Sequence, residues 1–109
     1  MAVGIVTHAE SPFVRDDPGK SRLVVEQNGA EAELVYRRNG DRLILVHTGV
    51  PAELAGRGVG GQLVRAAVER AAAEGLTVVP WCPYARKWLE DHPDAAAAVT
   101  VDWEPPPQP

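Results

Sequence analysis

A continuous apolar segment, Leu43 to Val46, precedes a glycine-rich segment, Ala55 to Gly61, that opens into a helical pattern. Glycines leave backbone N–H groups free of side-chain crowding and permit conformations that other residues avoid. The first turn of the following helix adds unpaired N–H donors and the positive end of the helix dipole. A strand, a glycine loop and a helix in this order therefore predict an anion-binding site, most naturally for a phosphate or pyrophosphate group.

The residues around these glycines disfavour two common kinds of nucleotide-binding loop. Gly56, Gly58 and Gly61 satisfy the G-x-G-x-x-G pattern, but a dinucleotide-binding fold expects an acidic residue about 20 positions later. That region reads Val78-Val79-Pro80-Trp81-Cys82 and contains no carboxylate. A P-loop needs Lys and then Ser or Thr after its last glycine, whereas Gln62 follows Gly61 here. Nucleoside triphosphate hydrolysis is therefore disfavoured.

The first half of the chain predicts a mostly antiparallel sheet. Two Asn-Gly pairs, Asn28-Gly29 and Asn39-Gly40, separate three predicted strands at residues 22–27, 30–38 and 41–48. The second strand alternates apolar and charged residues, so one of its faces should be buried and the other should face solvent. The third strand lacks this alternation and is expected to be central, with both faces covered.

A helix and a parallel strand are predicted after the glycine loop. Gly75 should end the helix, and its apolar residues recur at helical spacing: Leu63, Val64, Ala67, Val68 and Ala71. Residues 76–81 predict a strand parallel to the third one, with the helix as its crossover. Pro80 cannot donate to a ladder, so the end of this strand should separate from its neighbour. A gap of this kind can hold an extended ligand by backbone hydrogen bonds.

The last part of the chain predicts a shorter helix and an edge strand. The helix should begin at Pro83 and end at His92-Pro93, with an inward stripe of Tyr84, Ala85, Trp88 and Leu89. Residues 99–103 alternate as in an edge strand. The predicted fold class is α/β, with a mostly antiparallel sheet, a central helix after the glycine loop and a shorter C-terminal helix.

Several segments in a fixed order resemble the short GNAT-like acetyltransferases, minimal members of the GNAT superfamily of acyl-CoA-dependent N-acetyltransferases. These segments are Ile44-Leu45-Val46-His47-Thr48-Gly49-Val50, Gly56-Arg57-Gly58-Val59-Gly60, Gly75-Leu76-Thr77-Val78-Val79-Pro80, Cys82-Pro83-Tyr84 and His92-Pro93. The resemblance covers roughly residues 21–103. It implies that acetyl-CoA binds with its pyrophosphate on the glycine loop and its pantetheine arm in the gap between the two parallel strands.

The resemblance also implies which residues form the coenzyme A site. They are Val46, Val50, Ala55, Gly56, Arg57, Gly58, Val59, Gly60, Gly61, Cys82 and Tyr84. Arg57 can pair with phosphate oxygens. Ala55 stands where the superfamily usually has Gln or Arg, so one side-chain contact to the pyrophosphate is missing.

Three residues are candidates for catalysis. Cys82 precedes Pro83 at a predicted helix N-cap, a position that favours a thiolate. It can line the acyl site, carry a transient acetyl group, or serve as a small buried apolar residue. His47, at the end of the third strand, can accept a proton from an ammonium substrate or hold a structural hydrogen bond.

The resemblance adds detail on two of these candidates. Tyr84 is placed to donate a proton to the departing thiolate of coenzyme A, although its spacing with Trp88 equally suits a core-facing ring. An acidic residue often follows the His-Thr pair in the short family, and Gly49 occupies that position here. A metal site is not expected, because His47, Cys82 and His92 have no ligand spacing.

Composition limits the partners and the setting. The formal charge of −4, without a basic run, argues against nucleic acid and mildly favours a cationic amine. The chain has a single cysteine, no secretion-signal pattern at its start and no apolar run of about 18 residues, so a cytoplasmic protein is expected, with no membrane segment.

One domain is expected at residues 21–103, as a monomer or weak dimer. It is preceded by an arm at residues 1–20, which includes His8, and followed by a disordered Pro-rich tail at 104–109.

The expected function is transfer of an acetyl group from acetyl-CoA to a primary amine of unknown identity. Two alternatives remain from other classes. One is a coenzyme A binding module without turnover, to which Ala55 and Gly49 point. The other is a small interaction domain whose partner surface is formed by Trp81, Trp88 and Trp103.

Overall fold

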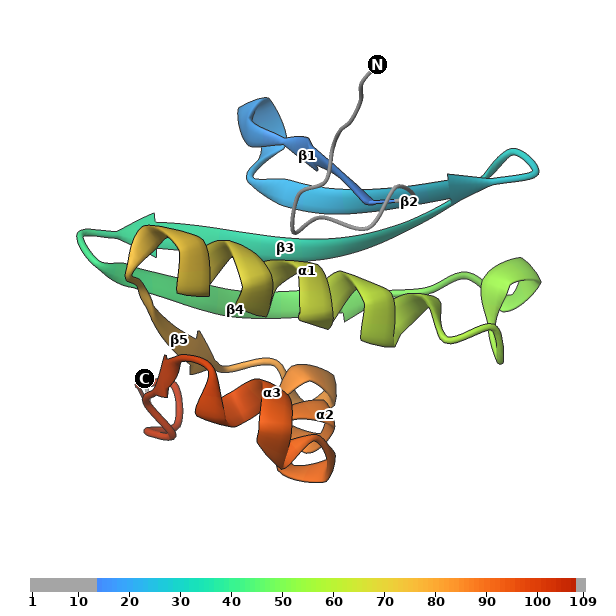
Figure 1. The fold of residues 1–109 in the computed structure, drawn as a ribbon. Coiled ribbons are helices and arrows are strands. Elements are labelled where there is room, and N and C mark those ends of the chain that lie inside the picture. Colours follow the sequence, from blue (N-terminus) through green and yellow to red (C-terminus); the bar gives the residue numbers. More distant parts are fainter. Residues whose placement is uncertain (1–13, 108–109) are drawn as a thin grey trace, which may run out of the picture.

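A computed structural model describes residues 14–107 and shows one six-stranded mixed sheet with helices (Figure 1). The strands follow one another across the sheet in chain order: β1 (Val14–Asp17), β2 (Arg22–Gln27), β3 (Ala30–Asn39), β4 (Arg42–Gly49), β5 (Thr77–Pro80) and β6 (Thr100–Val101). The helices are α1 (Val59–Glu74), α2 (Pro83–Asp91) and α3 (Pro93–Ala97). Short 3-10 helices lie at Pro18–Lys20 and Ala52–Leu54. The predictions made for His8 and for the last two residues of the tail lie outside the described residues.

The predicted antiparallel meander is confirmed, with one shift at a turn. Asn28 and Gly29 both have positive φ, at 53° and 80°, which is the pattern of a type I′ turn between β2 and β3. The second turn instead consists of Gly40 and Asp41, because Asn39 still pairs with Arg42. Of these two only Gly40, at 61°, has positive φ, as in a type II′ turn.

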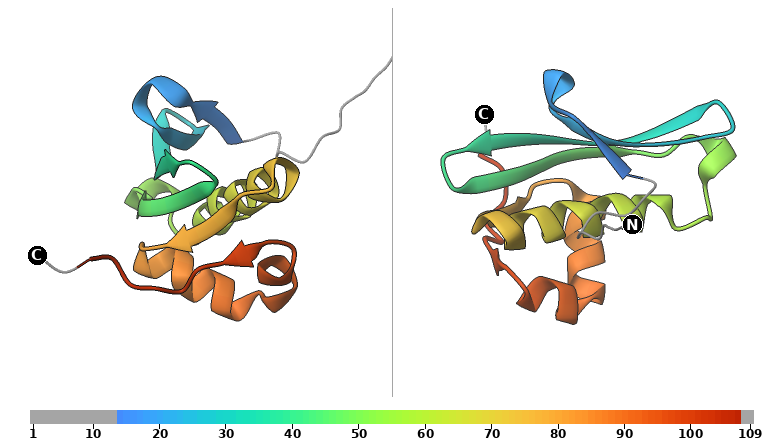
Figure 2. Two further views of the ribbon diagram at one scale, coloured as in Figure 1. Left: turned by 90° about the vertical axis from the view of Figure 1, so that its left-hand side faces the viewer. Right: turned by 45° about the horizontal axis from the view of Figure 1, so that its top comes forward.

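Strand β4 is central, as predicted, and its residues Leu43, Ile44 and Leu45 are all buried. It pairs antiparallel with β3 on one edge and parallel with β5 on the other. Helix α1 is the crossover between β4 and β5 and lies along one face of the sheet (Figure 2). The main core contains residues of α2 and the predicted inward residues of α1, which are Leu63, Val64, Ala67, Val68 and Ala71. The glycine loop therefore begins a helix whose position is fixed by this core.

Three features of the ends of the domain were not predicted. Residues 14–17, assigned to the arm, form strand β1, which pairs antiparallel with β2. Helix α3 follows α2 directly, with Pro93 at its first position. The final strand β6 has only two residues and pairs parallel with β5.

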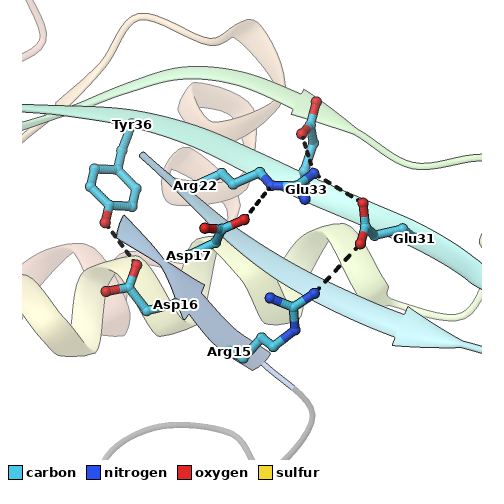
Figure 3. A network of polar contacts seen from close by, with 7 residues as sticks. All are labelled: Arg15, Asp16, Asp17, Arg22, Glu31, Glu33 and Tyr36. Carbon is cyan, nitrogen blue, oxygen red and sulfur yellow. Dashed lines mark hydrogen bonds and ion pairs between the residues drawn. The ribbon is translucent and has the colours of Figure 1, made fainter. Parts of the chain in front are cut away.

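A polar link joins β1 to β3 and α1. The hydroxyl of Tyr36 donates to Oδ1 of Asp16 at 2.7 Å (Figure 3). The guanidinium of Arg70 pairs with Oδ2 of the same carboxylate at 3.0 Å. Burial, and then the hydrogen bond to Asp16, raise the pKa of Tyr36 above its ordinary value of 10.0. The phenol is therefore held in its neutral form.

Replacing Tyr36 with phenylalanine should lower the free energy of unfolding by about 1.5 kcal/mol at neutral pH, because one hydrogen bond to a carboxylate is lost. A raised pKa in the folded state gives stability that is present below pH 10 and is lost as the pH rises above it. Urea unfolding over a pH series should therefore show a steeper alkaline loss for the wild type than for Tyr36→Phe. Parallel alkaline limbs would contradict this role.

Candidate active site

The glycine loop presents backbone donors at the start of α1. Gly56 and Gly58 have φ of 78° and 74°, a region in which L side chains are strained. Gly58 is the N-cap residue, and no side chain caps the helix. The first intrahelical bond runs from the N–H of Gln62 to the carbonyl of Gly58 at 3.0 Å, which leaves the N–H groups of the first turn without intrahelical acceptors. Residues 55–58 are exposed, so a bound anion can reach this end of the helix.

Arg57 and Ala55 lie on the exposed part of this loop. The side chain of Ala55 has no polar atom. Arg57 is the cationic side chain of the loop segment, residues 55–61. Val59 and Gly60 are buried behind it. The loop thus combines the exposed guanidinium of Arg57 with main-chain donors.

The first turn of α1 packs against α2 through glycines. A Cβ atom at Gly60 would lie 2.7 Å from the hydroxyl oxygen of Tyr84, and one at Gly61 would lie 2.8 Å from Nε1 of Trp88. Only glycine allows these two rings to approach so closely. The tyrosine hydroxyl is consequently held beside the backbone donors of the loop.

The prediction that Tyr84 faces the core is wrong. Its side chain is 45% exposed, whereas Ala85, Trp88 and Leu89 are buried as predicted. The proximity of Gly60 explains the difference, because the ring lies over the end of α1 and does not enter the layer between the helix and the sheet.

The side-chain amide of Gln62 carries an unused acceptor in the same turn. Within residues 14–107, its Oε1 is a buried side-chain oxygen without a hydrogen-bond partner. A buried polar atom without a partner is uncommon and costs free energy. Gln62 therefore retains capacity for one more hydrogen bond next to the glycine loop.

The parallel strands β4 and β5 separate as Pro80 predicts. Their pairing ends at Leu45 and Pro80, and the last bond across is from the N–H of Cys82 to the carbonyl of Leu45 at 2.9 Å. Strand β4 continues to Gly49, paired there only with β3. The edge of β4 beyond Leu45 therefore faces a widening gap on the β5 side.

A β-bulge lies where this gap begins. Val35 pairs with His47 and Tyr36 pairs with Leu45, so Val46 has no partner on β3. Bulges locally redirect the backbone and are frequent next to active sites. Val46 and Val50, both assigned to the coenzyme A site from sequence, lie half-buried on this stretch.

Cys82 lies on the other side of the gap. It is the N-cap residue of α2, as predicted, and its side chain is buried. Its Sγ lies 3.3 Å from Oγ1 of Thr48, and either atom can be the donor. This contact joins α2 to the part of β4 that has separated from β5.

His47 is exposed on the opposite face of β4 from Thr48. A Cβ atom at Gly49 would lie 3.3 Å from Nε2 of His47 and 3.9 Å from Oε2 of Glu33. The third histidine, His92, is not part of this arrangement: its ring stacks on Trp88, and its Nδ1 lies 2.7 Å from the carbonyl oxygen of Trp88. The sequence-predicted candidates thus gather along β4 and the starts of α1 and α2.

Two contacts in the site were not predicted from the sequence. Thr48 touches Cys82, and Glu33 faces Gly49 from the neighbouring strand. Both depend on which residues of distant segments lie opposite each other. The register set by the second turn would pair Glu33 with Thr48, and the bulge at Val46 shifts the pairing by one residue, so that Glu33 lies opposite Gly49. No local sequence signal predicts this bulge or the contact of Thr48.

Two structural tests concern metals and membranes. In the part of the chain that the structure describes, no three His, Cys, Asp or Glu side chains gather in a way that could hold a metal ion. Among the same residues, no helix has the length and apolar character needed to span a bilayer.

A sheet whose central parallel strands separate beside a glycine loop at a helix N-terminus is the GNAT fold. The sequence model of the GCN5-related N-acetyltransferase family matches residues 21–99, and the chain belongs to this family. The resemblance identified from the sequence is thereby confirmed. Members of this family in general use acetyl-CoA and act on amines.

Known proteins similar to this chain come from animals and bacteria. Protein NATD1 of Gallus gallus and of Homo sapiens is 32% identical over 83 residues, which is 73% of this chain and 76% and 74% of the two relatives. The NMR solution structure of a GCN5-like protein from Staphylococcus aureus has a TM-score of 0.65 and 30% identity. The match covers 86% of this chain and 94% of the Staphylococcus aureus chain.

Proposed function

We propose that this protein transfers an acetyl group from acetyl-CoA to a primary amine. The observation that carries the proposal is the separation of β4 from β5 beyond Leu45, next to an exposed glycine loop without a side-chain cap. An elongated ligand with an anionic diphosphate at one end and a thioester at the other suits both features.

The residues of this chain fit coenzyme A in their chemistry. The first-turn amides of α1 and the guanidinium of Arg57 are donors for the diphosphate. The backbone of β4 from Val46 to Val50 offers hydrogen bonds to an extended arm, and Cys82 lines the far side of the gap. The absence of a polar side chain at Ala55 places most of the diphosphate binding on the main chain.

We assign direct transfer to the site. The ammonium form of the amine gives one proton to Nε2 of His47. The neutral nitrogen then forms a C–N bond to the acetyl carbon and releases its second proton to solvent. The C–S bond breaks, and coenzyme A leaves as a thiolate that takes a proton from the hydroxyl of Tyr84. Alignment of the two substrates can itself supply about 7–11 kcal/mol of the barrier reduction, so strong acid and base groups are not required.

One alternative function is weakened by the structure. An interaction surface made of Trp81, Trp88 and Trp103 needs all three rings at the surface, but Trp88 is buried, with its ring against the first turn of α1. A coenzyme A binding module without turnover is the alternative that shares the same site. The cytoplasmic setting and a monomeric or weakly dimeric state stay predictions.

Two measurements test the proposed function. Calorimetric titration with acetyl-CoA should show binding, and a free-thiol assay with a panel of primary amines should show turnover. Binding without thiol release for any amine would indicate the non-catalytic module. No binding at millimolar acetyl-CoA would contradict both.

Cys82 is expected to line the acyl site without carrying the acetyl group. Cys82→Ser and Cys82→Ala should therefore keep thiol release within a few-fold of wild type, while the alanine variant loses about 1 kcal/mol of stability from the small cavity. Intact-mass spectra of the wild type with acetyl-CoA alone should show no added acetyl group. An acetyl adduct that disappears in Cys82→Ala, together with loss of turnover, would establish the covalent route instead.

A further inference from the structure

The space beside Gly49 is bounded by two groups that can handle an amine. Gly49 lies directly opposite Glu33 in the β3–β4 pairing, and residues opposite each other in an antiparallel pair project to the same face. The position of a Cβ atom at Gly49 is 3.3 Å from Nε2 of His47, 3.8 Å from Cγ of Glu33 and 3.9 Å from its Oε2. Because glycine has no side chain, the imidazole and the carboxylate both border the same open space.

The two oxygens of Glu33 differ in their partners. Oε1 accepts a hydrogen bond from Nη1 of Arg22 at 3.0 Å, as Figure 3 shows. Among residues 14–107, no donor is paired with Oε2, the oxygen nearer to Gly49. Arg22 therefore fixes the carboxylate in place and leaves one oxygen available for a ligand.

The surrounding charges favour a cation. Arg22 also binds Asp17 at 3.2 Å and Glu31 at 3.0 Å, and Arg15 pairs with Glu31 at 3.5 Å (Figure 3). The hydrogen bond to Glu33, followed by those to Asp17 and Glu31, raises the pKa of the Arg22 guanidinium, so it stays charged. Two cations against three carboxylates leave the network with one net negative charge.

A surface pocket lies at this place. It has a volume of about 500 Å³ and is lined by Arg22, Glu31, Glu33, Gly49, Val50 and Pro51. The pocket thus extends from the charged network to the end of β4, close to the gap assigned to acetyl-CoA.

We propose that Glu33 binds the ammonium group of the acceptor beside His47, and that the acceptor is a cationic primary amine without a carboxylate next to its nitrogen. This inference rests on the proposed function. Oε2 of Glu33 accepts a hydrogen bond from the ammonium ion, and Nε2 of His47 then takes the proton that the nitrogen must lose before it forms the C–N bond. A carboxylate beside the amine would be repelled by the net negative charge of the network.

The test uses the full chain and compares two glutamates that share one arginine. Glu31 and Glu33 both accept from Nη1 of Arg22 at 3.0 Å, but only Glu33 lies opposite Gly49. A linear diamine is titrated by calorimetry in the presence of coenzyme A, and its KM is measured with acetyl-CoA. Glu33→Gln should weaken diamine affinity and raise its KM about tenfold, the order expected for one lost hydrogen bond to a charged group. Glu31→Gln should change both much less, because it removes a charge of the network but no hydrogen bond to the ammonium ion.

A second variant separates a binding role from a structural one. Gly49 has no positive φ, so a side chain fits its strand after a small movement of His47. Gly49→Glu in the Glu33→Gln background returns a carboxylate to the same space and should restore much of the diamine affinity. Acetyl-CoA affinity should be the same in Glu33→Gln and Glu31→Gln as in the wild type.

The outcomes distinguish the two proposals. Unchanged diamine affinity in Glu33→Gln, an equal loss in Glu31→Gln, or no diamine binding by the wild type would overturn the amine site. A wild type that binds the diamine through Glu33 but releases no thiol would support the amine site and contradict acetyl transfer. Equal affinity for the diamine and for an amino acid of similar length would refute the predicted preference.

Discussion

Replacing His47 with alanine should lower kcat/KM for the amine about 100-fold, the low end of what one general base contributes. The residue is exposed and borders the space beside Gly49, so its loss should remove the proton acceptor without disturbing the core. The glycine loop is a separate element, and acetyl-CoA affinity should therefore stay at the wild-type value. Free-thiol release over a pH series measures this loss of kcat/KM against the wild type.

His92→Ala is the matched control for this experiment. His92 is engaged with Trp88 by ring stacking and by a hydrogen bond to its carbonyl, and it lies at the end of α2. Its replacement should affect stability and leave the pH profile of thiol release in place. If His47→Ala keeps the wild-type rate and profile, another group or solvent accepts the proton.

Gly58→Ala should weaken acetyl-CoA binding about 100-fold. Gly58 is the N-cap of α1 with φ of 74°, and an L side chain there favours a different backbone conformation. A changed conformation turns the loop amides away from the diphosphate, and each lost hydrogen bond to a charged group is worth about 1.5–3 kcal/mol. Calorimetric titration with coenzyme A measures the loss directly, because it does not depend on turnover.

The chain offers a control of equal backbone strain. Gly29 has φ of 80°, and a Cβ atom there would meet nothing within 4 Å, as at Gly58. Gly29→Ala should cost about 1–2 kcal/mol of stability, similar to Gly58→Ala, since both force a residue with a side chain into the left-handed region. Only Gly58→Ala should bind acetyl-CoA more weakly. A similar decrease in both variants would attribute the effect to general destabilisation.

Local sequence signals predicted most of the fold. The Asn-Gly pairs, the helical spacing of residues 63–71 and the proline at position 80 each constrain the backbone within a few residues, and the corresponding elements are present. The sequence did not predict strand β1 because Val14-Arg15-Asp16-Asp17 contains one apolar residue, and because the hydrogen bond that holds it to β3 joins Asp16 to Tyr36, 20 positions away. Helix α3 was not predicted because a helix of five residues is too short to show a helical period of apolar residues.

The candidate site also contains some features that local sequence signals predict and others that they do not. The N-cap position of Cys82 followed from the adjacent Pro83, which the structure confirms. The exposure of Tyr84 could not be predicted, because its helical spacing with Trp88 suggests that both rings face the core. The ring is exposed because it packs over Gly60 of α1, a contact that the sequence does not reveal. The position of Glu33 required the register of β3 against β4, which is set by the turn at Gly40 and Asp41 and is then shifted by one residue at the bulge at Val46.

The agreement between chain order and strand order across the sheet bears on how the domain assembles. Each strand finds its neighbour among the segments immediately before or after it, and the first four are joined only by tight turns or a single short helical turn. Pairings between segments close in sequence have a small loop-closure cost, and such topologies fold quickly for their size. The meander can therefore form early, with α1 packing on it afterwards, so that the proposed coenzyme A site is completed late, by the helix whose first turn forms part of it.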